Sequence, residues 1–232
     1  MIFGVGRQQV LANKPKGVIF FDVDGTLTHG TSSGAYLGQF LGHAEAVQDM
    51  ETRYAQGLVS NDEVCDVDAA GWKGRTEGEI TTWLDGLPLV IGIEEVVGWC
   101  LENNFVPKLA TLAWQPVGRY LCERFGFQGY DGPVLDVVDG KFSGVVKTYF
   151  DESAKSFSAL EFAASIGVSA NRCVAIGDSC SDLPLFSKVG YTIGFNAVDE
   201  VQAVANESFT GSDLRVILPS LAVWIKNRTY GG

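Results

Sequence analysis

Two carboxylates lie two residues apart in the segment DVDGT, residues 22–26, which directly follows the apolar run GVIFF. A strand that is buried on both faces and ends at a site has this pattern. Where the chain turns out of the strand, Asp22 can present its carboxylate over the sheet edge as a nucleophile. Asp24 can offer its backbone carbonyl to a cation and its side chain as a general acid and base. A turn with a capping aspartate would explain the same five residues without any chemistry.

A second pair of carboxylates lies in the segment GDSCSD, residues 177–182, after another apolar run. Asp178 is a candidate ligand for a hard cation, and Asp182 begins the helix that we expect to follow. Mg²⁺ prefers oxygen ligands and keeps several of its waters, so two carboxylates and one carbonyl are sufficient protein ligands. A helix N-cap would account for Asp182 but not for Asp178.

Short apolar runs that are typical of buried strands recur along the chain and alternate with helical patterns. We expect strands at residues 17–24, 106–112, 173–178 and 191–195, and helices at 115–126 and 153–167, both of which end at a glycine. This alternation predicts an α/β protein with a parallel sheet. The carboxylates that follow different strands then meet at the carboxyl edge of the sheet, where ligands of open α/β folds bind.

The stretch between the first strand and Phe105, about a third of the chain, carries few strand signals and is too long for one loop. Residues 60–63 (SNDE) and 76–79 (TEGE) have the spacing of capping boxes, so we expect three or four short helices between residues 31 and 86. We assign residues 31–89 to a helical cap, and residues 1–30 and 90–232 to the α/β core. The pair Asp139-Gly140 predicts a small hairpin.

Composition excludes several other classes of protein. The chain has 232 residues, of which 46% are hydrophobic and 19% charged, so it folds into a globular structure. Five cysteines without a CxxC pair and only two histidines argue against a structural zinc module. A net charge of −11 argues against nucleic-acid or anionic-membrane partners. No leader or long apolar stretch is evident, so we expect a cytoplasmic protein, either a monomer or a homodimer.

Four motifs follow one another along nearly the whole chain: DVDGT, a predicted strand that ends at Thr111, Lys155, and GDSCSD. This order resembles the haloacid dehalogenase (HAD) superfamily, in its phosphoserine-phosphatase-like branch with a helical cap. The resemblance implies a Rossmann-like, three-layer parallel sheet core with the cap inserted after the first strand. Taken alone, Thr111 is typical of ordinary strand packing and Lys155 of a solvated helix start.

The resemblance implies a phosphatase in which Asp22 attacks phosphorus and becomes a transient aspartyl phosphate. Asp24 would protonate the leaving alcohol and then activate the water that hydrolyses the intermediate. Asp22, the Asp24 carbonyl and Asp178 would hold Mg²⁺, and Asp182 would support Lys155 or the waters of the metal.

The resemblance also implies three positions that bind the phosphoryl group of a small phosphorylated substrate. Thr111 would donate its hydroxyl, Lys155 would supply positive charge, and Gly25 would lie beside the phosphate. The usual glycine pair after the second motif is replaced by Leu112-Ala113, so the backbone there approaches phosphate less closely.

Three residues that phosphoserine-specific members of the family use are not evident here. Glycine stands at position 25 in place of serine, the glutamate expected near Thr31 to meet the substrate amine is absent, and an arginine expected in the cap is missing. The segment at that place, DEVCDVD, carries Asp62, Glu63, Asp66 and Asp68. A solvated helix face explains it, and so does a cap that receives a hydroxyl-rich or cationic leaving group. We therefore expect L-phosphoserine to be a poor substrate.

Other functions remain to be weighed. A dehalogenase does not need Asp24, and a binding protein on this scaffold would tolerate its loss. A phosphotransferase, a phosphomutase or a phosphoserine phosphatase proper would keep every motif.

Three remaining side chains have no assigned chemistry. We expect Cys180 to be a packing residue because its acidic neighbours oppose a thiolate. His29 either lines the pocket or lies on the surface, and His43 has no identifiable partner.

Overall fold

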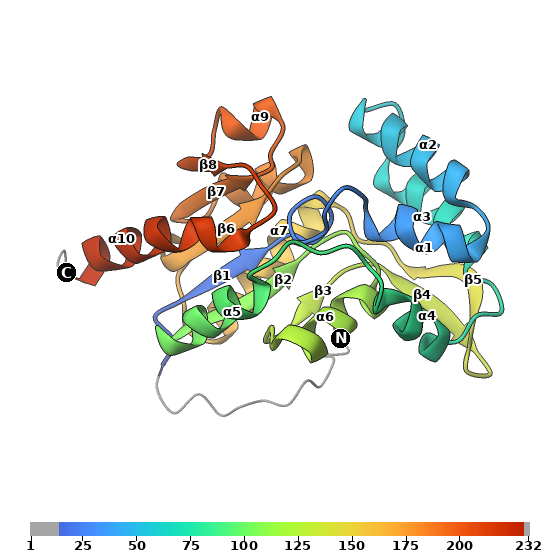
Figure 1. The fold of residues 1–232 in the computed structure, drawn as a ribbon, viewed down its shortest axis with the longest axis horizontal. Helices are drawn as coiled ribbons and strands as arrows, with labels where there is room; N and C mark the ends of the chain where they lie inside the picture. The colour runs from blue at the N-terminus through green and yellow to red at the C-terminus, as the bar shows by residue number, and fades with distance from the viewer. Residues whose placement is uncertain (1–13, 230–232) are drawn as a thin grey trace.

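The computed structural model describes residues 14–229, and six of its strands form one parallel sheet (Figure 1). The strand order is β3-β2-β1-β6-β7-β8, so the strand that precedes Asp22 lies in the middle. These strands are β1 (Gly17–Phe21), β2 (Phe105–Ala110), β3 (Tyr130–Asp131), β6 (Cys173–Gly177), β7 (Tyr191–Phe195) and β8 (Glu207–Phe209).

The central strand β1 is buried along its whole length because its alternating side chains enter two separate cores. Ile19 and Phe21 belong to a core with α5, α6 and α10, whereas Val18 and Phe20 belong to a core with α7, α8 and α9. The sheet therefore has a layer of helices on each face, which confirms the predicted three-layer core. These helices are α5 (Ile93–Glu102), α6 (Gln115–Phe125), α7 (Glu152–Ser165), α8 (Leu183–Phe186), α9 (Asp199–Gln202) and α10 (Leu218–Thr229).

The four strands and two helices predicted from the sequence all form, with small shifts at their ends. The predicted first strand leaves the sheet at Phe21, so both Asp22 and Asp24 lie in the turn that follows. The edge strands β3 and β8 were not predicted, because they are short and lack a continuous apolar run. Three short 3₁₀ helices complete the core: η1 (Ala170–Arg172), η2 (Cys180–Asp182) and η3 (Leu214–Ile217).

Four helices follow β1 and form the lobe at the right of Figure 1, as the capping signals predicted. They are α1 (Ser33–Leu41), α2 (Ala44–Ala55), α3 (Asn61–Gly71) and α4 (Glu77–Leu84). Both capping boxes are present: Ser60 and Glu63 cap α3, and Thr76 and Glu79 cap α4. We refer to α1–α4 as the cap; its boundaries at residues 31 and 89 remain a prediction.

The predicted hairpin forms from β4 (Val134–Val138) and β5 (Lys141–Thr148), and its turn residues Asp139 and Gly140 have the positive φ angles of 51° and 76° that such a turn requires. It packs on α3: the rings of Phe142 and Trp72 are 5.2 Å apart, and the Gly74 amide donates to the Phe142 carbonyl at 2.8 Å. Within residues 14–229, no helix has both the length and the apolar character needed to cross a membrane.

Candidate active site

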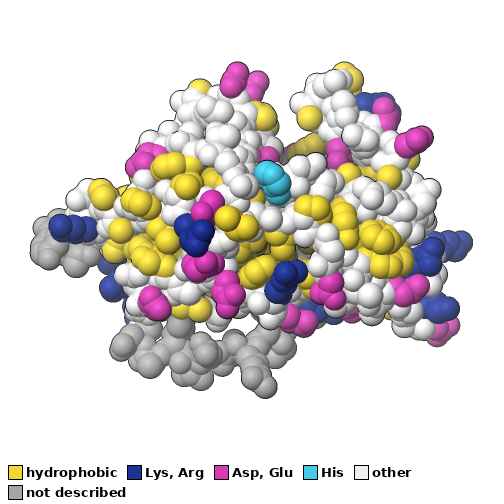
Figure 2. Space-filling model, in the orientation of Figure 1, with side chains coloured by type: hydrophobic (Ala, Val, Ile, Leu, Met, Phe, Trp, Pro, Cys, Tyr) yellow, Lys and Arg dark blue, Asp and Glu magenta, His cyan; other side chains and the backbone are white. Residues whose placement is uncertain are grey.

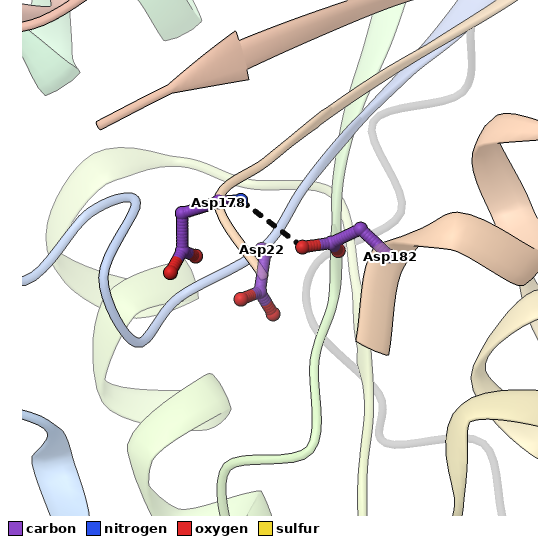
Figure 3. Close-up of side chains that lie close together, drawn as sticks. All are labelled: Asp22, Asp178 and Asp182. Carbon is purple, nitrogen blue, oxygen red and sulfur yellow. Dashed lines mark hydrogen bonds between the residues drawn. The ribbon is translucent and has the colours of Figure 1, made fainter. Parts of the chain in front are cut away.

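Three carboxylates converge where β1 and β6 end (Figure 3). Asp22 follows β1, Asp178 follows β6, and Asp182 ends η2. One oxygen from each lies within 4.8 Å of the others, and Asp22 lies between the other two. The Asp182 carboxylate accepts hydrogen bonds from the backbone amides of Asp178 and Ser179, at 3.1 and 3.2 Å, which fixes its orientation. The two acidic motifs that lie far apart in the sequence thus form one cluster.

Lys155 is the cation of this cluster. It lies in the first turn of α7 and its side chain is fully buried, so it does not belong to a solvated helix start. Its ammonium donates to Asp22 at 2.9 Å and to Asp182 at 2.7 Å. Burial opposes the charge, but the two carboxylates outweigh burial and raise the pKa of Lys155 above its ordinary value.

A single ammonium does not neutralise three carboxylates, and the pKa values reflect this. Burial, followed by the charges of Asp22 and Asp182, raises the pKa of Asp178 to about 9. Burial also raises the pKa of Asp182 to about 6, against the effect of Lys155. Hard carboxylate oxygens with excess negative charge are the donor set that a divalent cation such as Mg²⁺ prefers. The residues present therefore fit a divalent cation between Asp22 and Asp178.

Two glycines make room for these carboxylates. A β-carbon at Gly25 would lie 2.2 Å from an Asp178 oxygen, and the φ angle of 83° at Gly25 is itself strained for any other residue. A β-carbon at Gly177 would lie 2.2 Å from the Asp182 carboxylate. Glycine at position 25 thus matches the placement of Asp178.

Asp24 is not part of this cluster and lies in the turn that follows β1. Its two carboxylate oxygens accept from the amide and the hydroxyl of Ser33, at 2.6 and 2.9 Å. Burial is the main cause that raises the pKa of Asp24 to about 6; the Ser33 bonds oppose it and the charge of Glu51 adds to it. A carboxyl group with this pKa can both give and take a proton near neutral pH. Ser33 was not predicted as a site residue; its only signal is its place nine residues after Asp24.

Thr111 directly follows β2 and is buried. Its hydroxyl oxygen accepts from the Ala113 amide at 3.1 Å. Within the described residues its own proton has no acceptor, so this proton is available for a ligand oxygen. Because β1 pairs with β2, Gly25 and Thr111 lie after neighbouring strands. Their contact with phosphate remains a prediction.

The cap contacts the core beside Lys155 through two residues that sequence reasoning missed. The Tyr54 hydroxyl donates to Glu152, and the Asn61 amide donates to the Phe150 carbonyl at 2.9 Å. Burial and the Glu152 contact raise the pKa of Tyr54, and the charges of Asp182 and Asp22 add to this effect. The end of α2 thus contacts the first residue of α7.

The acidic segment of the cap has two different parts. Asp62, Glu63 and Asp66 are exposed, as a solvated face predicts. Asp68 is buried, so the solvated-face interpretation is wrong for this residue. His43, for which the sequence indicated no partner, lies 2.8 Å from the Asp68 carboxylate. This contact could not be predicted, because His43 directly precedes α2 whereas Asp68 lies on α3.

The two other unassigned side chains are exposed. Cys180 is exposed rather than packed, so the packing interpretation is wrong. It is the first residue of the 3₁₀ helix η2, and the sequence does not show which residues of such a short helix face the solvent. His29 lies on the surface, and its amide donates to the Pro88 carbonyl at 3.0 Å.

A pocket lies between the loop that precedes α1 and the helix α2, and its lining residue Ser32 directly precedes the Ser33 that binds Asp24. Its volume is about 390 Å³. Glu51 is its single charged side chain and accepts from the Ser32 hydroxyl at 2.6 Å. The lining residues are Gly30, Thr31, Ser32, Ala35, Gln48, Glu51, Thr52 and Ala55. In the space-filling view the surface is hollowed between the lobe of α9 and the lobe of α2 (Figure 2).

Curated proteins with similar sequences include phosphoserine phosphatases. One from Archaeoglobus fulgidus is 25% identical over 203 residues, which cover 87% of this chain and 59% of that protein. Phosphoserine phosphatase SerB2 of Mycobacterium tuberculosis is 26% identical over 220 residues, which cover 92% of this chain and 52% of that protein. The chain thus spans somewhat more than half the length of these relatives.

The fold is shared with solved structures. A phosphoserine phosphatase described as a phospho-aspartyl intermediate analogue superimposes with a TM-score of 0.78 at 23% identity, and covers 89% of this chain and 99% of that one. A substrate-bound phosphoserine phosphatase gives a TM-score of 0.79 at 22% identity, with coverages of 90% and 99%. A family model for haloacid dehalogenase-like hydrolases matches residues 19–187, a span that includes every residue of the carboxylate cluster. The chain therefore belongs to the haloacid dehalogenase-like hydrolase family.

Proposed function

We propose that this protein is a Mg²⁺-dependent phosphatase that hydrolyses a small-molecule phosphomonoester through an aspartyl phosphate on Asp22. One observation carries the proposal: Asp22 contacts Lys155 and lies beside Asp178, while Asp24 is held separately with a pKa of about 6. A nucleophile, a charge-compensating ammonium and a separate proton donor are the groups that phosphoryl transfer to a carboxylate needs. The phosphoserine phosphatases among its relatives support this reaction class.

In the first half-reaction an Asp22 oxygen forms a bond to phosphorus, and the bond from phosphorus to the substrate alcohol breaks. The Asp24 carboxyl gives its proton to the departing alcohol oxygen. Lys155 lies 2.9 Å from Asp22 and balances part of the negative charge that gathers there. The free proton of the Thr111 hydroxyl is suited to a hydrogen bond with a phosphoryl oxygen.

In the second half-reaction water attacks phosphorus and gives a proton to the Asp24 carboxylate. The bond between phosphorus and Asp22 then breaks, which releases inorganic phosphate and restores the Asp22 carboxylate. The two Ser33 hydrogen bonds keep the Asp24 carboxyl in one orientation for both proton transfers.

Mg²⁺ would be held by Asp22, the Asp24 carbonyl and Asp178. The bound ion supplies positive charge that brings the anionic phosphate next to three carboxylates. Asp182 is already engaged by Lys155 and by two backbone amides, so its role is to orient Lys155 rather than to bind the ion.

The pocket beside Asp24 would receive the leaving group. None of its eight lining residues is lysine or arginine, and Glu51 gives it negative charge. The basic residues nearest in the sequence have other contacts: Arg53 lies 3.9 Å from Asp49, Arg75 lies 3.5 Å from Glu79, and Lys73 packs against Gly144 of the hairpin. A substrate carboxylate would thus meet repulsion without a cationic partner. The proposed substrate is therefore a phosphorylated sugar, polyol or amino alcohol that lacks a carboxylate.

Phosphate release by purified variants tests the mechanism. We expect Asp22→Asn to abolish turnover because it removes the nucleophile, and Asp24→Asn to reduce kcat by about 10²–10⁴-fold because it removes proton transfer. Asp136→Asn, on the hairpin, is the matched control and should be unchanged. Turnover by Asp22→Asn at the wild-type rate would contradict the covalent mechanism.

Substrate competition tests the pocket. We expect kcat/KM for phosphoethanolamine to exceed that for L-phosphoserine at least tenfold, and Glu51→Gln to reduce this ratio because it removes the pocket's charge. Exposed Glu45→Gln on the same helix is the control. A preference for L-phosphoserine would show that a basic side chain reaches the pocket and that the assignment of the leaving group is wrong.

A further inference from the structure

Asp68 makes an unusual set of contacts for a residue on a helix of the cap. Its side chain is buried and accepts three hydrogen bonds. One oxygen accepts from His43 Nε2 at 2.8 Å and from Trp72 Nε1 at 3.2 Å, and the other accepts from Trp114 Nε1 at 2.6 Å. His43 and Trp72 belong to the cap region, whereas Trp114 belongs to the core. A single buried carboxylate therefore joins the two parts.

The core end of this contact lies in the loop that contains Thr111. Trp114 follows Thr111 by three residues and is the N-cap residue of α6. Ala113, which directly precedes Trp114, donates its amide to the Thr111 hydroxyl. The hydrogen bond from the Trp114 indole to Asp68 therefore holds the C-terminal end of the loop of residues 111–114. The Trp72 and Trp114 rings also contact each other at 6.2 Å.

We propose that Asp68 is a positioning residue that couples docking of the cap to phosphate binding. Through Trp114 it holds the loop of residues 111–114 in the conformation that presents the Thr111 hydroxyl to phosphate. This inference rests on the proposed role of Thr111. The coupling works in both directions: an interaction that favours the docked cap strengthens phosphate binding, and bound phosphate favours the docked cap.

The chemistry of the contact supports a specific role. Burying a carboxylate is costly unless several donors compensate it, and apolar side chains could join α3 to the core without that cost. Both oxygens of Asp68 accept from N–H donors, so an amide at this position would point its NH₂ group at an indole or imidazole N–H. Asp68→Asn thus keeps the shape of the side chain while it breaks at least one of these bonds.

Binding of inorganic phosphate, measured calorimetrically with Mg²⁺ present, tests the proposal without any leaving group. We expect Asp68→Asn and Trp114→Phe each to weaken phosphate binding about tenfold, the effect of one lost hydrogen bond to a charged group. The double variant should bind phosphate about as tightly as the more weakly binding of the two single variants, because each substitution removes the same contact. Asp66→Asn, an exposed residue of the same helix, is the control and should bind as the wild type does.

The indole ¹H–¹⁵N signal of Trp114, assigned by its loss in Trp114→Phe, provides a spectroscopic readout. We expect saturating phosphate to shift this signal in the wild type, and Asp68→Asn to move it before any ligand is added. A Trp114 indole signal whose chemical shift does not change on addition of phosphate would overturn the proposal. Trp114→Phe keeps an aromatic ring at this position, so the test remains informative if Asp68→Asn does not fold.

Thr111→Val separates this inference from the proposed function. If Thr111→Val weakens phosphate binding while Asp68→Asn and Trp114→Phe bind normally, the coupling through Asp68 is wrong and the phosphate site stands. If Thr111→Val binds phosphate normally, the proposed role of Thr111 is wrong and the inference falls with it.

Discussion

Mg²⁺ should bind more tightly as the pH rises through neutrality, because Asp178 holds a proton in the metal-free protein. Burial and the neighbouring carboxylates raise the pKa of Asp178 to about 9, whereas the pKa of an aspartate in an unfolded chain is about 3.9. The folded state therefore binds the extra proton between these values, and the metal-free protein loses stability as the pH rises from about 4 to about 9. A bound cation needs the carboxylate, so binding releases this proton.

The magnitude follows from the release of one proton. The dissociation constant for Mg²⁺ should fall up to about tenfold per pH unit between pH 6.5 and 8.5, which corresponds to about 1.4 kcal/mol. Asp178 is partly exposed, so this value is an upper limit. At about 2–4 °C per kcal/mol for a chain of this length, the difference in Tm between saturating Mg²⁺ and EDTA should widen by up to about 3–6 °C per pH unit.

Calorimetric titration with Mg²⁺ in two buffers of different ionisation enthalpy counts the released protons, and thermal unfolding with Mg²⁺ or EDTA gives the Tm difference. Asp178→Asn has no proton to release at this position, so its weaker Mg²⁺ binding should be independent of pH in this window. Wild-type binding that is equally independent of pH would refute the assignment of Asp178 as a metal ligand with a raised pKa.

Two further variants test the packing of the site. Lys155→Met should destabilise the protein by about 3–5 kcal/mol in urea unfolding, because it leaves buried Asp22 and Asp182 without their cation. The control Lys147→Met changes an exposed residue and should alter stability by less than about 0.5 kcal/mol. An equal loss of stability in both variants would contradict the buried ion pair. Gly25→Ala should weaken Mg²⁺ binding at least tenfold, because its β-carbon would overlap the Asp178 carboxylate; unchanged binding would show that Asp178 adopts another position when the ion binds.

Local patterns were sufficient to predict most of the fold. Continuous apolar runs identified the four central strands, and serine or threonine three residues before glutamate identified the starts of α3 and α4. The strands β3 and β8 have two and three residues, and they form because β2 and β7 are there to pair with them. No local signal marks such strands.

The site could be predicted only in part. Asp22 and Asp178 follow apolar strands, so the sheet edge brings them together whatever the details of the loops. Lys155 becomes buried because α7 packs against the cluster, and the sequence of a helix start cannot show this. Asp68, His43 and Trp114 meet because α3 docks against the loop after β2. Their contacts depend on the relative position of the cap and the core, which only the tertiary structure defines.

The measurement that tests the account most directly is the site of phosphorylation during turnover. Wild-type protein that is quenched during turnover should carry the intermediate, because its hydrolysis is a separate step that needs the Asp24 base. After an acid quench, reduction with borohydride converts an aspartyl phosphate to homoserine, which peptide mass spectrometry can locate. We predict that this change, dependent on substrate and Mg²⁺, occurs at Asp22. Phosphate release without any modified aspartate, or modification of a different residue, would contradict the account.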